Sequence, residues 1–249
     1  MNFKEPKNIL EFIKFQKTVL RKFRIFVNKA ISINYKKAAI FVYWLNDYIS
    51  FLNEEERFNP SYNITYKRGQ IVFVNFGYRI GRELGGNHYA VVLDVKNSRK
   101  SHTVTVVPLN SLKETETTYS KIYHVPLGDC VKTLLYEKSS DIRTFVKEEL
   151  LKLAGEVSQY SSSELPKKKS GIYEKITSLS KQQKAAEQIL CYTKKLKSES
   201  VANVGQILTI SKQRIIHPCK SNDILTGIIL SDELMSLIDD KIKKIYIGD

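Results

Sequence analysis

Short runs in which hydrophobic and polar residues alternate fill the middle of the chain. Each run is rich in Val, Ile, Phe or Tyr and is bounded by clusters of Gly, Asn, Ser or Lys. Such alternation is typical of half-buried strands. The runs lie at residues 70–76, 89–95, 103–109 and 122–127. They predict a small antiparallel β domain in which a polar loop, residues 77–87, joins the first two strands.

Before this β domain, apolar residues recur at helical spacing. Residues 6–27 and 38–52 each predict an amphipathic helix, and a turn near residues 32–34 would join the two into an antiparallel hairpin. The single tryptophan, Trp44, is expected in a core. A two-helix hairpin cannot bury its own apolar stripes. It therefore has to pack on the following domain, on a second copy or on a partner.

The predicted hairpin also carries many cations, among them Lys14, Lys17, Arg21, Lys22 and Arg24. These side chains form either an RNA-facing surface or the solvated side of a helix. The second role is the more common one for charges on an amphipathic helix.

Residues 130–199 again show helical spacing. Asp141 is expected to cap a helix that ends near Gly155, and a longer helix is expected from residue 171 or 180 to residue 197. A polar linker at residues 158–170 would separate them. Such a helical layer would extend an RNA-binding surface or fix an oligomer; the alternative is a structural elaboration.

The C-terminal segment predicts one more strand and one more helix. Residues 201–210 form an apolar run of strand type, and Ser231 is expected to cap a final amphipathic helix with acidic residues in its first turn.

Composition and charge narrow the class of partner. The chain has 249 residues, of which 42% are hydrophobic, so it can form a core and is not expected to be disordered. Its formal net charge is +14. That excess favours a polyanionic partner, because each phosphate that a cation neutralises releases counterions. Nucleic acid is therefore preferred to a membrane as partner.

The cysteines and the apolar segments indicate a soluble, cytoplasmic protein. Cys130, Cys191 and Cys219 lie far apart, which argues against a disulfide framework and against a structural zinc site. The first residues lack the apolar run of a signal peptide, and the apolar segment 38–52 is too short to cross a bilayer. We therefore expect neither a membrane partner nor a cofactor.

The loop at residues 77–87 holds the most suggestive chemistry. Arg79 and Arg82 offer forked donors for phosphate, and the pair Gly85 and Gly86 lets the backbone turn sharply beside a ligand. The loop delivers His88 to the start of the next strand. A charged hairpin loop with a glycine turn is the plain alternative.

Several motifs together resemble the MazF/PemK family of toxin endoribonucleases. The resemblance rests on KRGQIV at residues 67–72, on G-x-E-x-G-G at residues 81–86 and on VPL at residues 107–109, and it resumes at residues 204–214 and in the last helix. In all it covers residues 66–129 and 200–249. It implies an α+β fold: a small antiparallel SH3-like β-barrel at residues 63–249. Helices at residues 1–62 and an insertion at residues 130–199 would elaborate it.

The resemblance also implies metal-independent, sequence-selective cleavage of single-stranded RNA such as mRNA, by attack of the substrate's own 2′-hydroxyl. It implies a homodimer and a cognate antitoxin that blocks the substrate groove. The chain differs from the family in two segments. His88 and Tyr89 stand where the family has arginine and proline, and Asn110, followed by Ser111, stands where it has threonine.

The residues at these positions can still perform the reaction. Histidine exchanges protons near neutral pH, so His88 is the candidate acid-base group, with Arg82 on the phosphate and Asn110 or Ser111 donating to a non-bridging oxygen. His124 or His217 is the candidate second proton carrier. The candidate RNA-binding residues are Tyr78, Arg79, Glu83, Gly85, Gly86, Gln206 and Arg214.

Four alternatives remain open from the sequence. His88 could begin a strand without transferring a proton, and Glu83 fits a salt bridge better than a general base. The chain could bind nucleic acid or protein without cutting RNA, or poison a topoisomerase, as a toxin of the same fold class does.

Overall fold

The structure is a computed structural model that describes residues 5, 8–111, 121–161, 165–195, 199–221, 223 and 225–248. The chain divides into two compact units, Met1–Arg57 and Phe58–Asp249. The division falls shortly before the domain boundary expected at residue 62.

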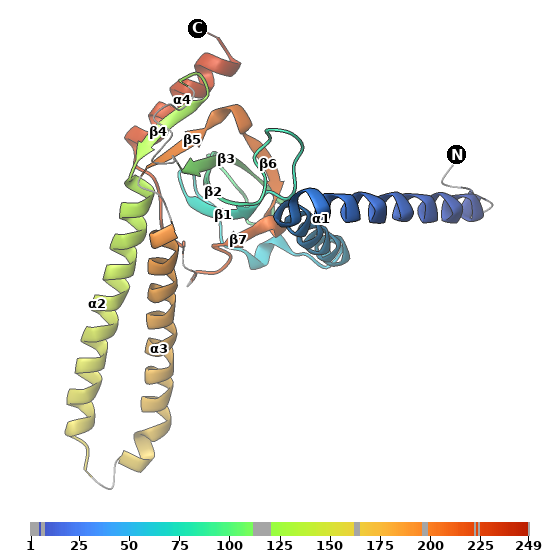
Figure 1. Cartoon of the computed structure of the whole chain (residues 1–249). Helices are drawn as coiled ribbons and strands as arrows, with labels where there is room; N and C mark the ends of the chain where they lie inside the picture. The colour runs from blue at the N-terminus through green and yellow to red at the C-terminus, as the bar shows by residue number, and fades with distance from the viewer. Residues whose placement is uncertain are drawn as a thin grey trace. The chain divides into compact units, whose positions relative to one another are not determined.

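The first unit is one long helix with a break. α1 (Ile9–Glu54) leaves helical geometry at Asn34, which has φ −154° and ψ 88° (Figure 1). The Asn34 side chain accepts a hydrogen bond from the Lys37 backbone N–H at 3.0 Å and so caps the second segment. The rings of Phe23 and Phe41, on either side of the break, lie 5.8 Å apart. The two segments therefore fold onto each other, and we name them the α1 hairpin.

The second unit is built on an antiparallel sheet. Its strands are β1 (Ile71–Asn75), β2 (Asn87–Val92), β3 (Thr103–Ser111), β4 (His124–Gly128), β5 (Ser200–Asn203), β6 (Leu208–Ser211) and β7 (Ile215–His217). The order is β4-β5-β3-β2-β1-β7, and β6 also pairs with β3. β3 pairs with β2 and β6 through its first six residues and with β5 from Leu109 onward. Among the described residues, no pairing joins β4 to β7.

One expected strand is wrong. Residues 201–210 form β5 and β6, separated by a 3-10 turn at Val204–Gln206. A Cβ added to Gly205 would lie 2.9 Å from the Tyr123 ring, so the chain approaches that ring closely where it turns.

The two faces of the sheet bury different cores. One face carries Val72, Val74, Ala90 and Val106 in a core closed by Tyr66. The other face carries Ile71, Val91 and Val107, and the helices pack against it: α2 (Cys130–Ser158), α3 (Leu165–Lys195) and α4 (Asp232–Tyr246). Successive residues of a strand point to opposite faces, which produces this division.

The helical insertion differs from its expected boundaries. α2 begins at Cys130, and Asp141 lies inside it rather than at its N-cap. Val131, Leu135 and Ser139 recur every fourth residue on its buried side, so core packing starts the helix earlier. α3 begins at Leu165, within the expected linker. The expected helix end at residue 197 lies outside the described residues.

The C-terminal helix is confirmed. Ser231 caps α4, and its hydroxyl accepts a hydrogen bond from the Leu234 N–H at 3.4 Å. Arg68 ties α4 to the sheet, since it donates to Asp239 and, at 2.6 Å, to the Leu93 carbonyl. Of the helices described, none is long and apolar enough to cross a membrane.

Candidate functional site

The candidate site lies where β2 begins and β3 ends. His88 stands opposite Val74, and Val74 belongs to the core closed by Tyr66. The half-buried His88 ring contacts the backbone of Gly85 in the loop and of Leu109 in β3. Burial lowers the pKa of His88, and the two backbone hydrogen bonds oppose that shift without cancelling it. The imidazole is therefore neutral at pH 7.

Asn110 faces the same side of the sheet as His88. Its neighbour Leu109 points to the helix-covered core, so alternation along β3 turns Asn110 to the opposite face. Its Oδ1 is buried and accepts no hydrogen bond in the described structure. Ser111, the next residue, is exposed at the end of β3. The strand ends thus bring together two of the expected catalytic residues, His88 and Asn110.

Backbone hydrogen bonds close the base of the loop that precedes His88. The Phe76 N–H donates to the Gly86 carbonyl at 2.8 Å, and the Gly86 N–H donates to the Gly77 carbonyl at 2.7 Å. A Cβ on Gly85 would lie 2.7 Å from the Gly77 carbonyl oxygen, so the two arms touch. Gly86 has φ +84°, which favours glycine. Both glycines therefore shape the loop.

The two arginines of the loop differ in their contacts. Arg79 donates from Nε to the Phe76 carbonyl at 3.1 Å, and its Nη1 lies 3.9 Å from the Glu83 carboxylate. Glu83 is thus in the salt bridge expected of it. Arg82 is exposed, and Tyr78 is half-buried. The loop presents Arg82 outward and keeps part of Arg79 for its own structure.

Gln206 and Arg214 hold the loop and the strand before it. The Leu84 N–H donates to Gln206 Oε1 at 2.5 Å, and Gln206 Nε2 donates to the Arg82 carbonyl at 3.1 Å. Arg214 donates from Nε to the Asn75 carbonyl at 2.8 Å. The Asn75 side chain in turn accepts from the Gly77 N–H at 2.9 Å. Asn75 was missed from the sequence, although an asparagine two residues before a glycine is a turn signal.

Replacing Gln206 with glutamate is expected to loosen the loop without unfolding the protein. A carboxylate still accepts from the Leu84 N–H but cannot donate to the Arg82 carbonyl. We expect hydrogen exchange at the Leu84 amide to speed up by about fivefold to tenfold. Gln159→Glu, at the exposed C-cap of α2, is the control and should leave that amide unchanged. Equal exchange in both variants would contradict the clamp.

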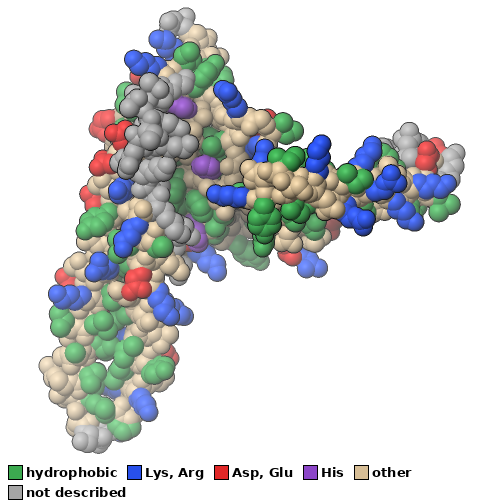
Figure 2. Space-filling view, in the orientation of Figure 1, with side chains coloured by type: hydrophobic (Ala, Val, Ile, Leu, Met, Phe, Trp, Pro, Cys, Tyr) green, Lys and Arg blue, Asp and Glu red, His purple; other side chains and the backbone are tan. Residues whose placement is uncertain are grey.

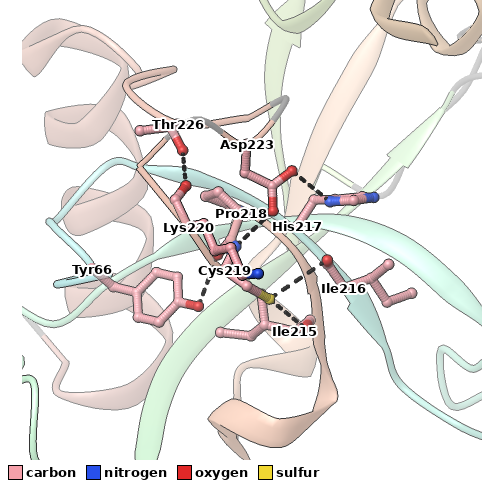
Figure 3. Close-up of polar contacts among 9 residues, drawn as sticks. All are labelled: Tyr66, Ile215, Ile216, His217, Pro218, Cys219, Lys220, Asp223 and Thr226. Atoms are coloured by element: carbon pink, nitrogen blue, oxygen red, sulfur yellow. Dashed lines mark hydrogen bonds and ion pairs between the residues drawn. The ribbon is translucent and has the colours of Figure 1, made fainter. Parts of the chain in front are cut away.

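The other histidines lie away from His88. His217 of β7 stands opposite Phe73 of β1, whereas His88 of β2 stands opposite Val74. The side chains of the two histidines therefore point to opposite faces of the sheet. Figure 3 shows His217 turned toward Asp223, with Nδ1 2.7 Å from a carboxylate oxygen. His102 packs edge-on against Phe58, with ring centroids 6.1 Å apart.

His124, unlike His217, faces the same side of the sheet as His88. It stands opposite Asn203 on β5 and alternates with Val125, which points to the helix-covered core. It therefore faces the same side as Asn110, with β5 between the two strands. Its Nδ1 is buried without a partner among the described residues, and burial lowers its pKa.

Cys219 lies beside the His217–Asp223 pair and is expected to react slowly. Its thiol is within 3.2 Å of the Ile215 carbonyl, and its backbone N–H donates to Asp223 at 2.9 Å (Figure 3). Burial, with the Asp223 charge, raises the pKa of the Cys219 thiol to about 11. Iodoacetamide at pH 8 should therefore alkylate the exposed Cys191 first, as peptide mass spectrometry will show. Equal labelling of both thiols would contradict this burial.

Among the described residues, no group of three or more His, Cys, Asp or Glu side chains could hold a metal ion.

Residues 67–172 match the family of PemK-like, MazF-like toxins of type II toxin-antitoxin systems, so the chain carries a toxin domain of this family. The match reaches from before β1 into α3. Residues 200–249 lie outside it. No curated protein matches the chain in sequence.

Proposed function

We propose that this chain is a toxin that cuts single-stranded RNA as a sequence-selective endoribonuclease, without a metal ion. The observation that carries the proposal is the meeting of a neutral His88 with Asn110 on one face of the sheet, beside a loop that presents Arg82. A base, a hydrogen-bond donor for phosphate and a cation are the groups that RNA self-cleavage requires.

In the proposed reaction, neutral His88 takes the proton of a ribose 2′-hydroxyl. The 2′-oxygen attacks the adjacent phosphorus, a new P–O2′ bond forms and the P–O5′ bond breaks. The products are a 2′,3′-cyclic phosphate and a 5′-hydroxyl. Burial lowers the pKa of His124, which makes it a poor acid near neutral pH. We therefore assign the proton on the departing 5′-oxygen to water.

The remaining site residues would bind the phosphate and the bases. Asn110 can donate its amide N–H to a non-bridging oxygen, and Ser111 follows it at the exposed end of β3. Arg82, with the part of Arg79 not held by Phe76, would neutralise the phosphate. Tyr78 would stack on a base. Gly85, Gly86, Glu83, Gln206 and Arg214 would act by shaping the loop, because their described contacts are within the protein.

The pH dependence of cleavage should reflect the lowered pKa of His88. A general base works when it is deprotonated, and burial moves the deprotonation of His88 to lower pH. We expect kcat/KM to stay level as the pH falls to the ordinary histidine value of about 6.5 and to drop only below it. A profile that already falls between about pH 8 and pH 7 would contradict His88 as the base.

The toxin domain implies further features of the assembly. Its sheet would close as an SH3-like barrel. A cognate antitoxin would cover the substrate groove beside the loop at residues 77–87, which we call the arginine loop. A homodimer acting on mRNA in the cytoplasm is the state that we expect. Sedimentation of the purified chain tests the dimer: a particle of one chain's mass would contradict it.

The test of the proposed activity is incubation of purified protein with a long single-stranded RNA in EDTA, with the fragment ends mapped. Discrete cuts that end in 2′,3′-cyclic phosphates are expected. RNA that is shifted in a gel but stays intact would replace the proposal with a non-catalytic binding module. Intact RNA together with DNA damage would replace it with a topoisomerase poison.

A further inference from the structure

The α1 hairpin leaves most of its apolar side chains uncovered. Ala38 is its one buried residue among those described. More than half of the large hydrophobic side chains that are exposed in the described structure belong to it, including Leu10 at 74%, Phe15 at 61% and Ile33 at 74% exposure. Trp44, expected in a core, is half-buried and stacks between Phe41 and Tyr48. The two segments thus cover only the middle of each other's apolar faces.

The polar face of the first segment carries charge of nearly one sign. Residues 9–33 contain a single acidic residue, Glu11. Their cations are Lys14, Lys17, Arg21, Lys22, Arg24 and Lys29. At 100° per residue these six fall on one arc of the helix, and Phe12, Phe15 and Val19 lie on the other. Figure 2 shows Lys and Arg side chains and hydrophobic side chains along this hairpin. The charges of α2, by contrast, are mixed, with five basic and five acidic residues.

We propose that the α1 hairpin binds the surface of an anionic lipid bilayer and lies in the headgroup region. A helix with cations on one face and Phe, Ile, Leu and Trp on the other suits that interface. It does not need to cross the membrane, and no described helix is long and apolar enough to do so. The sequence-based expectation of no membrane partner rested on the preference for nucleic acid as the polyanion and on the lack of a spanning segment. An interfacial helix does not require a spanning segment.

The competing occupants fit the hairpin less well. RNA would pair with the cations but offers no apolar surface to Val19 and Leu20, which are exposed and aliphatic. A second hairpin would cover the apolar flanks but gives no reason for six cations against one acid on the outer arc. A bilayer with acidic headgroups accounts for both features.

The only tryptophan of the chain makes the proposal testable in the whole protein. Trp44 lies in the hairpin, so its fluorescence reports on the hairpin alone. We expect a blue shift and co-flotation with phosphatidylcholine vesicles that contain about one third phosphatidylserine, and neither with pure phosphatidylcholine. Raising the salt concentration should weaken binding, because screening reduces the attraction.

Two variants separate the charge from the apolar face. Lys14→Glu with Lys17→Glu should weaken binding to the anionic vesicles by at least about tenfold, and Phe15→Ser should weaken it by about tenfold. Lys167→Glu with Lys169→Glu, at exposed positions of α3, changes the net charge equally and is the control that should bind as the wild type does. Helicity by circular dichroism should be the same in all the variants.

Three results would overturn the proposal. The first is an unchanged Trp44 spectrum with anionic vesicles. The second is a spectrum that shifts with single-stranded RNA but not with vesicles. The third is a smaller oligomer in the Phe15→Ser variant, with vesicle binding retained, which would assign the apolar face to a second copy. RNA cleavage is measured separately, since the hairpin proposal does not depend on that activity.

Discussion

Replacing His88 with alanine is expected to lower the rate of RNA cleavage by about 100-fold to 10,000-fold, the range in which a general base contributes. The imidazole is neutral because burial lowers its pKa, so the protein supplies a base that is ready at pH 7. Alanine removes the base and keeps β2, whose backbone pairing with β1 does not use the side chain. The measurement is the single-turnover rate on one mapped RNA site in EDTA.

His102→Ala is the matched control for this prediction. His102 is an exposed histidine of the same unit, and its ring packs edge-on against Phe58. It should cut RNA at the wild-type rate. Cuts that survive in His88→Ala would instead assign the chemistry to Arg82, Arg79 and Ser111, which should then be replaced one at a time.

Most of the sheet could be predicted from the alternation of hydrophobic and polar residues, because a strand with one buried face has this alternation in its sequence. The ends of β1 to β4 lie within three residues of the ends of the expected runs. The run at residues 201–210 misled because both of its strands are apolar, and only Gly205 indicated the turn between them. Asp141 misled because a capping residue type can also lie on the exposed side of a helix.

The candidate site could be predicted only in part. His88, Asn110 and the arginine loop follow from motif chemistry and from the family resemblance. The loop clamp does not, since Gln206 and Leu84 are 122 positions apart and no local pattern links them. The face of the sheet to which His124 and His217 point could be assigned only from the strand register. A register shift of one residue would move each side chain to the other face.

The sequence left two interpretations of the helical insertion. It either extends an RNA-binding or oligomer surface or is a structural elaboration, and its packing bears on both. Val131 and Leu135 of α2 and Ile189 of α3 belong to the same core as Ile71 and Val91 of the sheet. The two helices also meet at Ser139, whose hydroxyl donates to the Ala186 carbonyl at 3.0 Å. The first turns of α2 are therefore part of the domain core. Farther along, α2 and α3 line a cleft that includes Arg143, Lys147, Ile176 and Lys184.

Leu135→Ala should consequently lower the free energy of unfolding by about 2–5 kcal/mol, although Leu135 is remote in sequence from every site residue. Its side chain is 0% exposed, so alanine leaves a cavity between α2 and the sheet. The neighbouring Tyr136 is 60% exposed, and Tyr136→Ala should change the same quantity by less than about 0.5 kcal/mol. Urea unfolding, followed by circular dichroism, measures both.

If Leu135→Ala unfolds like the wild type, the insertion is an appendage, and removing residues 141–197 should then change RNA affinity or oligomer size without unfolding the sheet. If the predicted loss is found, the insertion stabilises the toxin domain, and a deletion that starts within α2 would remove activity by unfolding it.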